Sequence, residues 1–96
     1  MTAGDSLVNK SPRKRLLFSE HALQQMRERG AAPEEVERTI TVGEEFLAKK
    51  GRNGYRLNFA FNALWGGKQY ATKQVVPIVA EDPAERVVVT VYVFYF

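Results

Sequence analysis

The sequence predicts an α+β domain in which two N-terminal helices pack on an antiparallel sheet of three to four strands. Between residues 19 and 43, the capping residues and the spacing of apolar side chains are helical. From residue 44 onward, apolar and polar side chains alternate, and turn residues gather at 51–54, 66–67 and 82–83. Helices followed by an unbroken series of strands favour helices gathered on one face of an antiparallel sheet.

The chain of 96 residues has the length of one domain and shows no internal repeat. Residues 1–15 are poor in apolar side chains and end in three bases, so they are predicted to be a flexible basic arm. Residues 16–96 are predicted to form a single domain. At its start, Leu16-Leu17-Phe18 forms either a short first strand or a hydrophobic anchor.

The first helix is predicted over residues 20–29. Ser19 is a favourable N-cap, and Gly30 is favourable just beyond the C-terminus. On a helical wheel, one apolar stripe faces the sheet, polar side chains lie opposite it and two arginines flank it. The stripe comprises Ala22, Leu23 and Met26, the polar side comprises His21, Gln24, Gln25 and Glu28, and the flanks are Arg27 and Arg29.

The second helix is predicted from Pro33 to residue 42. Proline suits the first turn of a helix, and the two glutamates that follow it favour the positive end of the helix dipole. Val36 and Ile40 are four residues apart and form its buried ridge. Gly43 ends the helix after a β-branched run that weakens the last turn.

Four stretches are predicted as strands: residues 46–48, 55–62, 69–80 and 86–96. Pro77 implies an edge position or a bulge in the third, because proline donates no ladder hydrogen bond. The fourth is so apolar that we expect it inside the sheet, where it cannot template aggregation. Strict alternation places Val87, Val89, Val91 and Val93 on one face and Arg86, Thr90 and Tyr92 on the other.

The composition excludes several classes of site. The chain has no cysteine and one histidine, so disulfides, thiolate metal sites and histidine-rich metal sites are excluded, and no metal or organic cofactor is expected. No apolar run has the length of a membrane span, and the first residues lack the apolar core of a signal peptide. We therefore expect a cytoplasmic protein without a membrane partner.

The charge is unevenly distributed along the chain. The net charge is only +3, yet residues 46–80 contain no acid. They contain the bases Lys49, Lys50, Arg52, Arg56, Lys68 and Lys73. A domain with one basic region suits a polyanion on that side, while ordinary scatter of surface charge explains the pattern equally well.

A sheet covered by helices on one face leaves the other face open. On the expected open face, arginines, amides, a hydroxyl and a phenol gather with little acid: Arg56, Asn58, Arg86, Thr90 and Tyr92. Such a mixture contacts phosphates and the 2′-OH of RNA, and a tyrosine can stack on a base. Taken singly, each residue also has a structural explanation, such as the strand propensity of threonine.

The only histidine lies on the first helix together with arginines. Cleavage of RNA without a metal requires a proton acceptor for the 2′-OH, a charge that stabilises the phosphorane and a proton donor for the leaving oxygen. Histidine titrates near neutral pH and arginine stays charged, so His21 and Arg29 suit these roles. They are about 12 Å apart along the helix at 1.5 Å per residue, so this spacing by itself does not place both on one phosphate. It permits one residue at the reacting centre and the other on a neighbouring phosphate, or Arg29 bracing the sheet. The alternative is that His21 belongs to a solvated helix face.

Two motifs in this chain resemble an uncharacterised bacterial domain family. The family pattern is His-Ala, two residues, Arg-Met, one residue and Glu-Arg-Gly, then a helix with Glu-x-Val and a last strand with Val-Thr-Val-Tyr. Here the motifs read His21-Ala22 through Met26 to Glu28-Arg29-Gly30, and Val89-Thr90-Val91-Tyr92. The family is similar to the RelE and BrnT toxins of the barnase–EndoU–colicin–RelE ribonuclease group. Gln25 stands where the family has its first arginine.

The resemblance implies a RelE-like fold and a metal-independent endoribonuclease of the toxin–antitoxin type, whose active site is His21, Arg29 and Thr90. We expect RNA as substrate and an antitoxin or immunity protein as partner. The residues expected to bind RNA are Arg27, Arg52, Arg56, Asn58, Arg86 and Tyr92. One alternative is a non-catalytic module that binds nucleic acid or a protein, which Gln25 favours. Another is a homodimer paired through the apolar last strand.

Overall fold

Two helices and five strands follow one another in residues 14–96, the part of the chain that the computed structural model describes. The arm predicted for residues 1–15 therefore lies almost entirely outside the described residues. The elements are β2 (Arg15–Phe18), α1 (Glu20–Arg29), α2 (Pro33–Val42), β3 (Glu44–Leu47), the 3₁₀ turn η1 (Lys49–Gly51), β4 (Asn53–Trp65), β5 (Lys68–Glu81) and β6 (Glu85–Tyr95).

The ends of both helices follow the capping residues. The Ser19 hydroxyl accepts a hydrogen bond from the Ala22 amide at 3.0 Å, and Gly30 ends α1 with φ of 83°, a left-handed conformation that glycine adopts freely. α2 begins at Pro33, and a carboxylate oxygen of Glu35 accepts a hydrogen bond from the Ala32 amide at 3.0 Å. The predicted bounds of both helices are confirmed.

The predicted antiparallel sheet of three to four strands is wrong, although the fold is α+β. In residues 14–96 the sheet has five strands in the order β2-β6-β5-β4-β3, and β2 pairs with β6 in parallel, Leu17 opposite Val87. The other three pairs are antiparallel. The parallel pair joins segments about seventy residues apart in sequence, so no local turn signal marks it.

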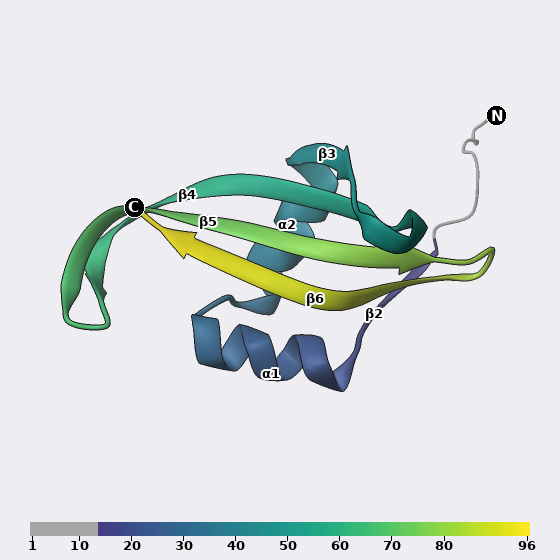
Figure 1. Ribbon diagram of the computed structural model, residues 1–96, viewed down its shortest axis with the longest axis horizontal. Helices are drawn as coiled ribbons and strands as arrows, with labels where there is room; N and C mark the ends of the chain where they lie inside the picture. The colour runs from purple at the N-terminus through teal and green to yellow at the C-terminus, as the bar shows by residue number, and fades with distance from the viewer. Residues whose placement is uncertain (1–13) are drawn as a thin grey trace, which may run out of the picture.

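The helices lie differently against the sheet. Figure 1 shows α2 behind the strands, whereas α1 lies beside the sheet along β6. The core between the helices and the sheet is made mostly of alanine and β-branched side chains, with one methionine and one tyrosine. It comprises Ala22, Met26, Ala31, Val36, Ile40, Tyr55, Val75, Val79, Val88 and Val91.

A bulge in β6 changes which residues share a face. Ile78 of β5 pairs with Thr90 and the next residue, Val79, pairs with Val88, so Val89 is an extra residue. Val88 and Val91 both point into the core with no exposed surface. Strict alternation along the last strand is therefore wrong, and residues before the bulge change face relative to those after it.

Pro77 lies in β5, which is an internal strand, so the prediction of an edge position is wrong and only the alternative of a bulge remains. It is buried and pairs with Val91 of β6. On its other side, β5 pairs with β4, and this ladder has no residue pair between Gly54–Ile78 and Leu57–Val75. Pro77 lies in that gap. The missing amide interrupts this ladder. The bulge lies one step further along, in β6.

Within residues 14–96, neither helix has the length and apolar content needed to span a membrane.

Candidate nucleic-acid interface

Side chains of α1 bind the main chain of β6 where β2 ends. The Ser19 amide donates to the Val88 carbonyl at 3.0 Å, directly after the last β2 pair. Beyond it, the Gln25 side-chain oxygen accepts from the Val91 amide at 2.8 Å, and the Arg29 guanidinium donates to the Val91 carbonyl at 2.8 Å. We call Gln25 and Arg29 the clamp. It takes the place of a neighbouring strand, because these main-chain groups otherwise lack a partner at the sheet edge.

The clamp corrects the predicted orientation of the first helix. Gln25 was assigned to the polar side, yet it is only 8% exposed, while Leu23 of the predicted apolar stripe is 36% exposed. α1 therefore turns toward the strand edge, where amide and carbonyl groups need polar partners. Because Gln25 forms a structural hydrogen bond, an arginine is not the only residue that this motif position can use.

The face of the sheet opposite α2 carries a pocket of about 430 Å³. Its lining comes from the end of β3, from η1 and the residues beside it, and from the open face of β5 and β6. The lining residues are Phe46, Leu47, Ala48, Lys49, Lys50, Arg52, Ile78, Thr90 and Tyr92. Among these lining residues of the described part of the chain, three are cations and none is an acid, so the pocket attracts anions.

Two local features build this pocket. The ring of Phe46 packs over Gly54, where a Cβ would overlap the ring, so only glycine allows β3 and β4 to pair this closely. The η1 turn then requires a left-handed residue, and Lys50 occupies it with φ of 62°. Residues other than glycine, asparagine and aspartate rarely adopt this backbone conformation.

Tyr92 connects the pocket to the clamp. Its ring is 44% exposed, and the Arg29 guanidinium lies 5.5 Å from the ring centroid. On the same face, Phe94 lies 6.4 Å from Tyr92 with the two rings 19° from parallel. Phe94 and Phe96 are also exposed, so a stripe of aromatic side chains follows β6 on the open face.

Arg56 and Asn58 lie in a neighbouring depression of the same face, together with Glu44 and Gln74. The Arg56 guanidinium lies 3.5 Å from a Glu44 carboxylate oxygen and 4.3 Å from the Phe46 ring centroid. The Asn58 side-chain oxygen accepts from the Gln74 amide at 3.0 Å. These two residues therefore border the pocket and already have protein partners.

His21 and Arg27 are both exposed on α1, on different sides of it. His21 is one turn before Gln25, about 40° around the helix, so it lies on the side of the clamp. Arg27 is two residues beyond Gln25, about 200° around the helix, and points away from the clamp. The structure thus brings Arg29, Thr90, Tyr92 and Arg52 to one region. His21 lies on the side of α1 that carries the clamp, and Arg27 lies on the other side.

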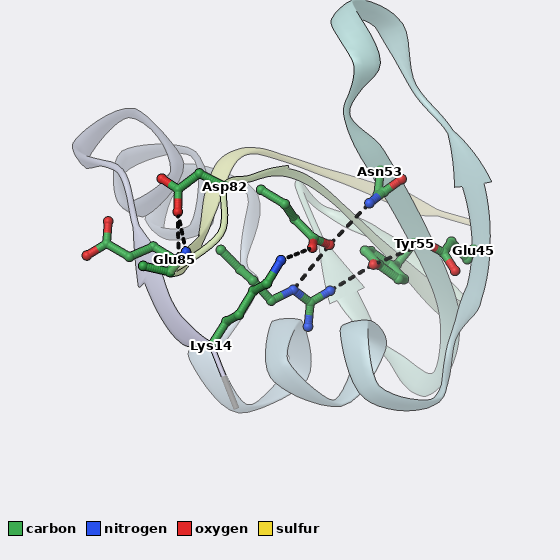
Figure 2. A network of polar contacts seen from close by, with 9 residues as sticks. Lys14, Glu45, Asn53, Tyr55, Asp82 and Glu85 are labelled. Carbon is green, nitrogen blue, oxygen red and sulfur yellow. Dashed lines mark hydrogen bonds and ion pairs between the residues drawn. The ribbon is translucent and has the colours of Figure 1, made fainter. Parts of the chain in front are cut away.

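Arg86 lies on the other face of the sheet, because the bulge at Val89 separates it from Thr90. Its guanidinium donates to the Tyr55 hydroxyl at 2.8 Å, and its Nε lies 3.3 Å from a Glu81 carboxylate oxygen, outside good hydrogen-bond geometry. Figure 2 shows the network around them, which we call the strand-end network. It consists of Lys14, Glu45, Asn53, Tyr55, Glu81 and Arg86.

The strand-end network changes two pKa values. The hydrogen bond from Lys14 lowers the pKa of Glu81 below its ordinary 4.5, and Asn53 and Arg86 act in the same direction. Burial raises the pKa of the Tyr55 hydroxyl above 10, although the nearby Arg86 opposes this. In the adjacent turn, the amides of Glu85 and Ala84 donate to the carboxylate of Asp82 and lower the pKa of Asp82. These contacts join five strand ends and leave Arg86 no part in the open face.

Lys73 has a structural role that the sequence did not indicate. It is 8% exposed, and its ammonium group donates to the Gly30 carbonyl at 2.8 Å and lies 2.9 Å from a Glu35 carboxylate oxygen. The Tyr95 hydroxyl donates to the Arg29 carbonyl at 2.6 Å, and burial raises the pKa of this hydroxyl. Both contacts fix the C-terminal end of α1, and hence Arg29, on the sheet.

The sequence also missed Phe46, Lys49, Lys50 and Ile78 as pocket residues. The absence of acids from residues 46–80 was the available signal for the two lysines, but it did not indicate which bases converge. Within residues 14–96, no three histidine, aspartate or glutamate side chains converge as a metal-binding group.

The fold and this face define a small α+β domain with an open, basic and aromatic sheet surface. Residues 18–93 match the family described as "Domain of unknown function (DUF4258)", and the chain belongs to this family. The match includes α1, the clamp, η1 and all of β6 except its last residues. No curated protein and no solved structure matches the chain.

Proposed function

We propose that this protein is a RelE-like domain that binds RNA across the open face of its sheet. The observation that carries the proposal is the pocket in which Lys49, Lys50 and Arg52 face Thr90 and Tyr92, without an acid among the lining residues that the structure describes. Cations attract the phosphates of a polynucleotide, and release of counterions makes such binding strongly dependent on salt.

The aromatic stripe favours RNA over a simple anion. Tyr92, Phe94 and Phe96 are 44%, 51% and 57% exposed on the face that carries the pocket. Exposed rings beside cations form the usual platform for unpaired bases, and each stacked base contributes about 1–3 kcal/mol. The Thr90 hydroxyl and the Tyr92 phenol also offer hydrogen bonds to a 2′-OH.

Titration of a fluorescent single-stranded RNA at several salt concentrations tests RNA binding. We expect the double variant Lys49→Gln/Arg52→Gln to bind at least tenfold more weakly, with the slope of log affinity against log salt reduced by about 1.4 for a single strand. The matched control is Arg38→Gln/Lys68→Gln, which removes the same charge from α2 and from the start of β5. An equal loss in both double variants would show that only net charge matters and would contradict the proposal.

A second function, cleavage of the bound RNA by attack of its 2′-OH, is supported by the clamp. Arg29 reaches both Val91 and the Tyr92 ring, and His21 lies on the same side of α1. In this proposal His21 is the general acid or base at the reacting phosphate, Arg29 stabilises the charge of a neighbouring phosphate, and Thr90 orients the substrate. A cytoplasmic enzyme of this kind requires an antitoxin or immunity protein as partner.

Incubation of total RNA with the protein in EDTA tests cleavage. We expect His21→Ala to cleave at least about a hundredfold more slowly than the parent, since a general acid or base contributes about 10²–10⁴ in rate. The control is Arg27→Ala, on the other side of α1, which should leave the rate unchanged. Absence of cleavage by the parent, or equal cleavage by His21→Ala, would exclude the catalytic function and leave the RNA-binding module.

A further inference from the structure

The pocket is built for something smaller than an RNA helix. Its volume of about 430 Å³ lies in the range of sites for small molecules, roughly 300–1,000 Å³. It lies between the segment Phe46–Arg52 and the open face of β5 and β6, so its occupant must enter between these two walls. A base inside a duplex cannot do so, whereas one unpaired nucleotide fits.

The two walls differ in chemistry. The wall formed by η1 and its flanking residue carries Lys49, Lys50 and Arg52. The wall formed by the sheet carries the apolar Ile78, the hydroxyl of Thr90 and the ring of Tyr92. A nucleotide has the same division, with its charge on the phosphate and its apolar surface on the base.

The backbone of η1 supplies an independent reason to regard the cationic wall as functional. Lys50 has φ of 62°, and η1 is otherwise an exposed short turn in which glycine would be unstrained. The next residue, Gly51, also has a positive φ, of 69°. A lysine held in a strained conformation at the mouth of a pocket is an outlier of the kind that gathers at ligand-binding sites.

The ring of Tyr92 is held ready for stacking before any ligand binds. Arg29 lies 5.5 Å from the ring centroid, and the same guanidinium is fixed by the Val91 carbonyl. Phe94 is exposed and stands nearly parallel to the ring, two residues further along the strand. A strand of RNA leaving the pocket therefore meets a second aromatic ring.

We propose that the pocket binds one unpaired nucleotide of an RNA strand, with its base stacked on Tyr92 and its phosphate held by Lys49, Lys50 and Arg52. This inference rests on the proposed function. It adds that the protein recognises RNA as a single strand, and it assigns the base and the phosphate to opposite walls.

Fluorescence of 2-aminopurine, placed once in a short RNA, tests the stacking. We expect the single strand to bind at least tenfold more tightly than the same RNA in a duplex, and its fluorescence to be quenched on binding. Tyr92→Leu should remove most of the quenching and weaken binding roughly tenfold, whereas Tyr92→Phe should retain both. Thermal unfolding of each variant shows whether the fold is kept, and Tyr92→Phe provides the comparison if the leucine variant is unstable.

The phosphate wall has its own variant. Lys50→Gly relieves the backbone and removes one cation, so it should fold at least as stably as the parent and bind single-stranded RNA several-fold more weakly. Salt-dependent binding that is equal for single strands and duplexes would overturn the pocket assignment while leaving the proposed function standing. Quenching that survives Tyr92→Leu would also overturn it. Absence of binding to any RNA would contradict the proposed function itself.

Discussion

The two halves of β6 have the same apolar and β-branched character and opposite surroundings. Before the bulge, residues 85–88 pair with β2, and Arg86 points to the helix-bearing face. After the bulge, the outer edge at Val91 is bound by Gln25 and Arg29 of α1, and Thr90 and Tyr92 point to the open face. One extra residue, Val89, separates a structural half from a half that carries the candidate site.

The comparison shows how this domain satisfies the main-chain hydrogen bonds at the outer edge of a long apolar strand when the neighbouring strand is short. A four-residue β2 covers only the first half of the edge, and two side chains substitute for it in the second. A strand partner would bind this edge through its main chain, whereas the clamp binds it through side chains and so also places Arg29 beside Tyr92. The same contacts that protect the edge therefore organise the open face.

Breaking the clamp should have the largest effect. Gln25→Leu removes the acceptor of the Val91 amide in a buried place, so we expect the free energy of unfolding to fall by about 1–3 kcal/mol. Urea unfolding measures it, with Gln24→Leu as the matched control, because Gln24 is exposed and bonds only to Glu28 on its own helix. Equal destabilisation of both variants would mean that the clamp contributes nothing.

Breaking the strand-end network should separate stability from RNA binding. Arg86→Met removes the hydrogen bond to Tyr55 and the ion pair with Glu81, and because these groups are partly exposed we expect a loss of about 1 kcal/mol. The affinity for RNA should stay within twofold of the parent, because Arg86 is on the other face. A tenfold loss of affinity in this variant at full folding would contradict the division of β6.

Acid should weaken the strand-end network specifically. The pKa of Glu81 is lowered in the folded state, so its stabilising contribution is present above its ordinary pKa of 4.5 and is lost as the pH falls through the lower, folded value. The free energy of unfolding, measured between pH 7 and pH 3, should therefore fall less steeply with decreasing pH in Glu81→Gln than in the parent. The lowered pKa of Asp82 remains in both proteins, and identical slopes would show that Glu81 has no such role.

Removing the left-handed backbone strain in η1 should give the smallest change in stability, and this change should be a stabilisation rather than a loss. Lys50→Gly relieves about 1 kcal/mol of left-handed strain and loses up to about 1 kcal/mol through the more flexible unfolded chain. The net expectation is a stabilisation of at most about 1 kcal/mol together with weaker binding of RNA. Guanidinium unfolding measures the first, and a destabilised variant would mean that the lysine side chain supports the turn.

Local signals in the sequence determined much of this protein. Ser19 and Gly30 set the ends of α1, Pro33 set the start of α2, and alternation after Gly43 indicated strands, because these signals act over a few residues. Membership of the family rests on residues 18–93 and is likewise a property of the sequence. The residues of the open face were foreseen in kind, as bases, amides and aromatic side chains.

Only the tertiary structure decided which of these residues meet. The parallel β2–β6 pair and the burial of Gln25 against Val91 depend on contacts between segments more than sixty residues apart. The bulge that sends Arg86 to the other face depends on how β5 and β6 pair. Such contacts leave no periodic trace in the sequence, because a strand edge accepts either another strand or the side chains of a helix. The free energy of satisfying that edge is what placed α1, and with it the candidate site.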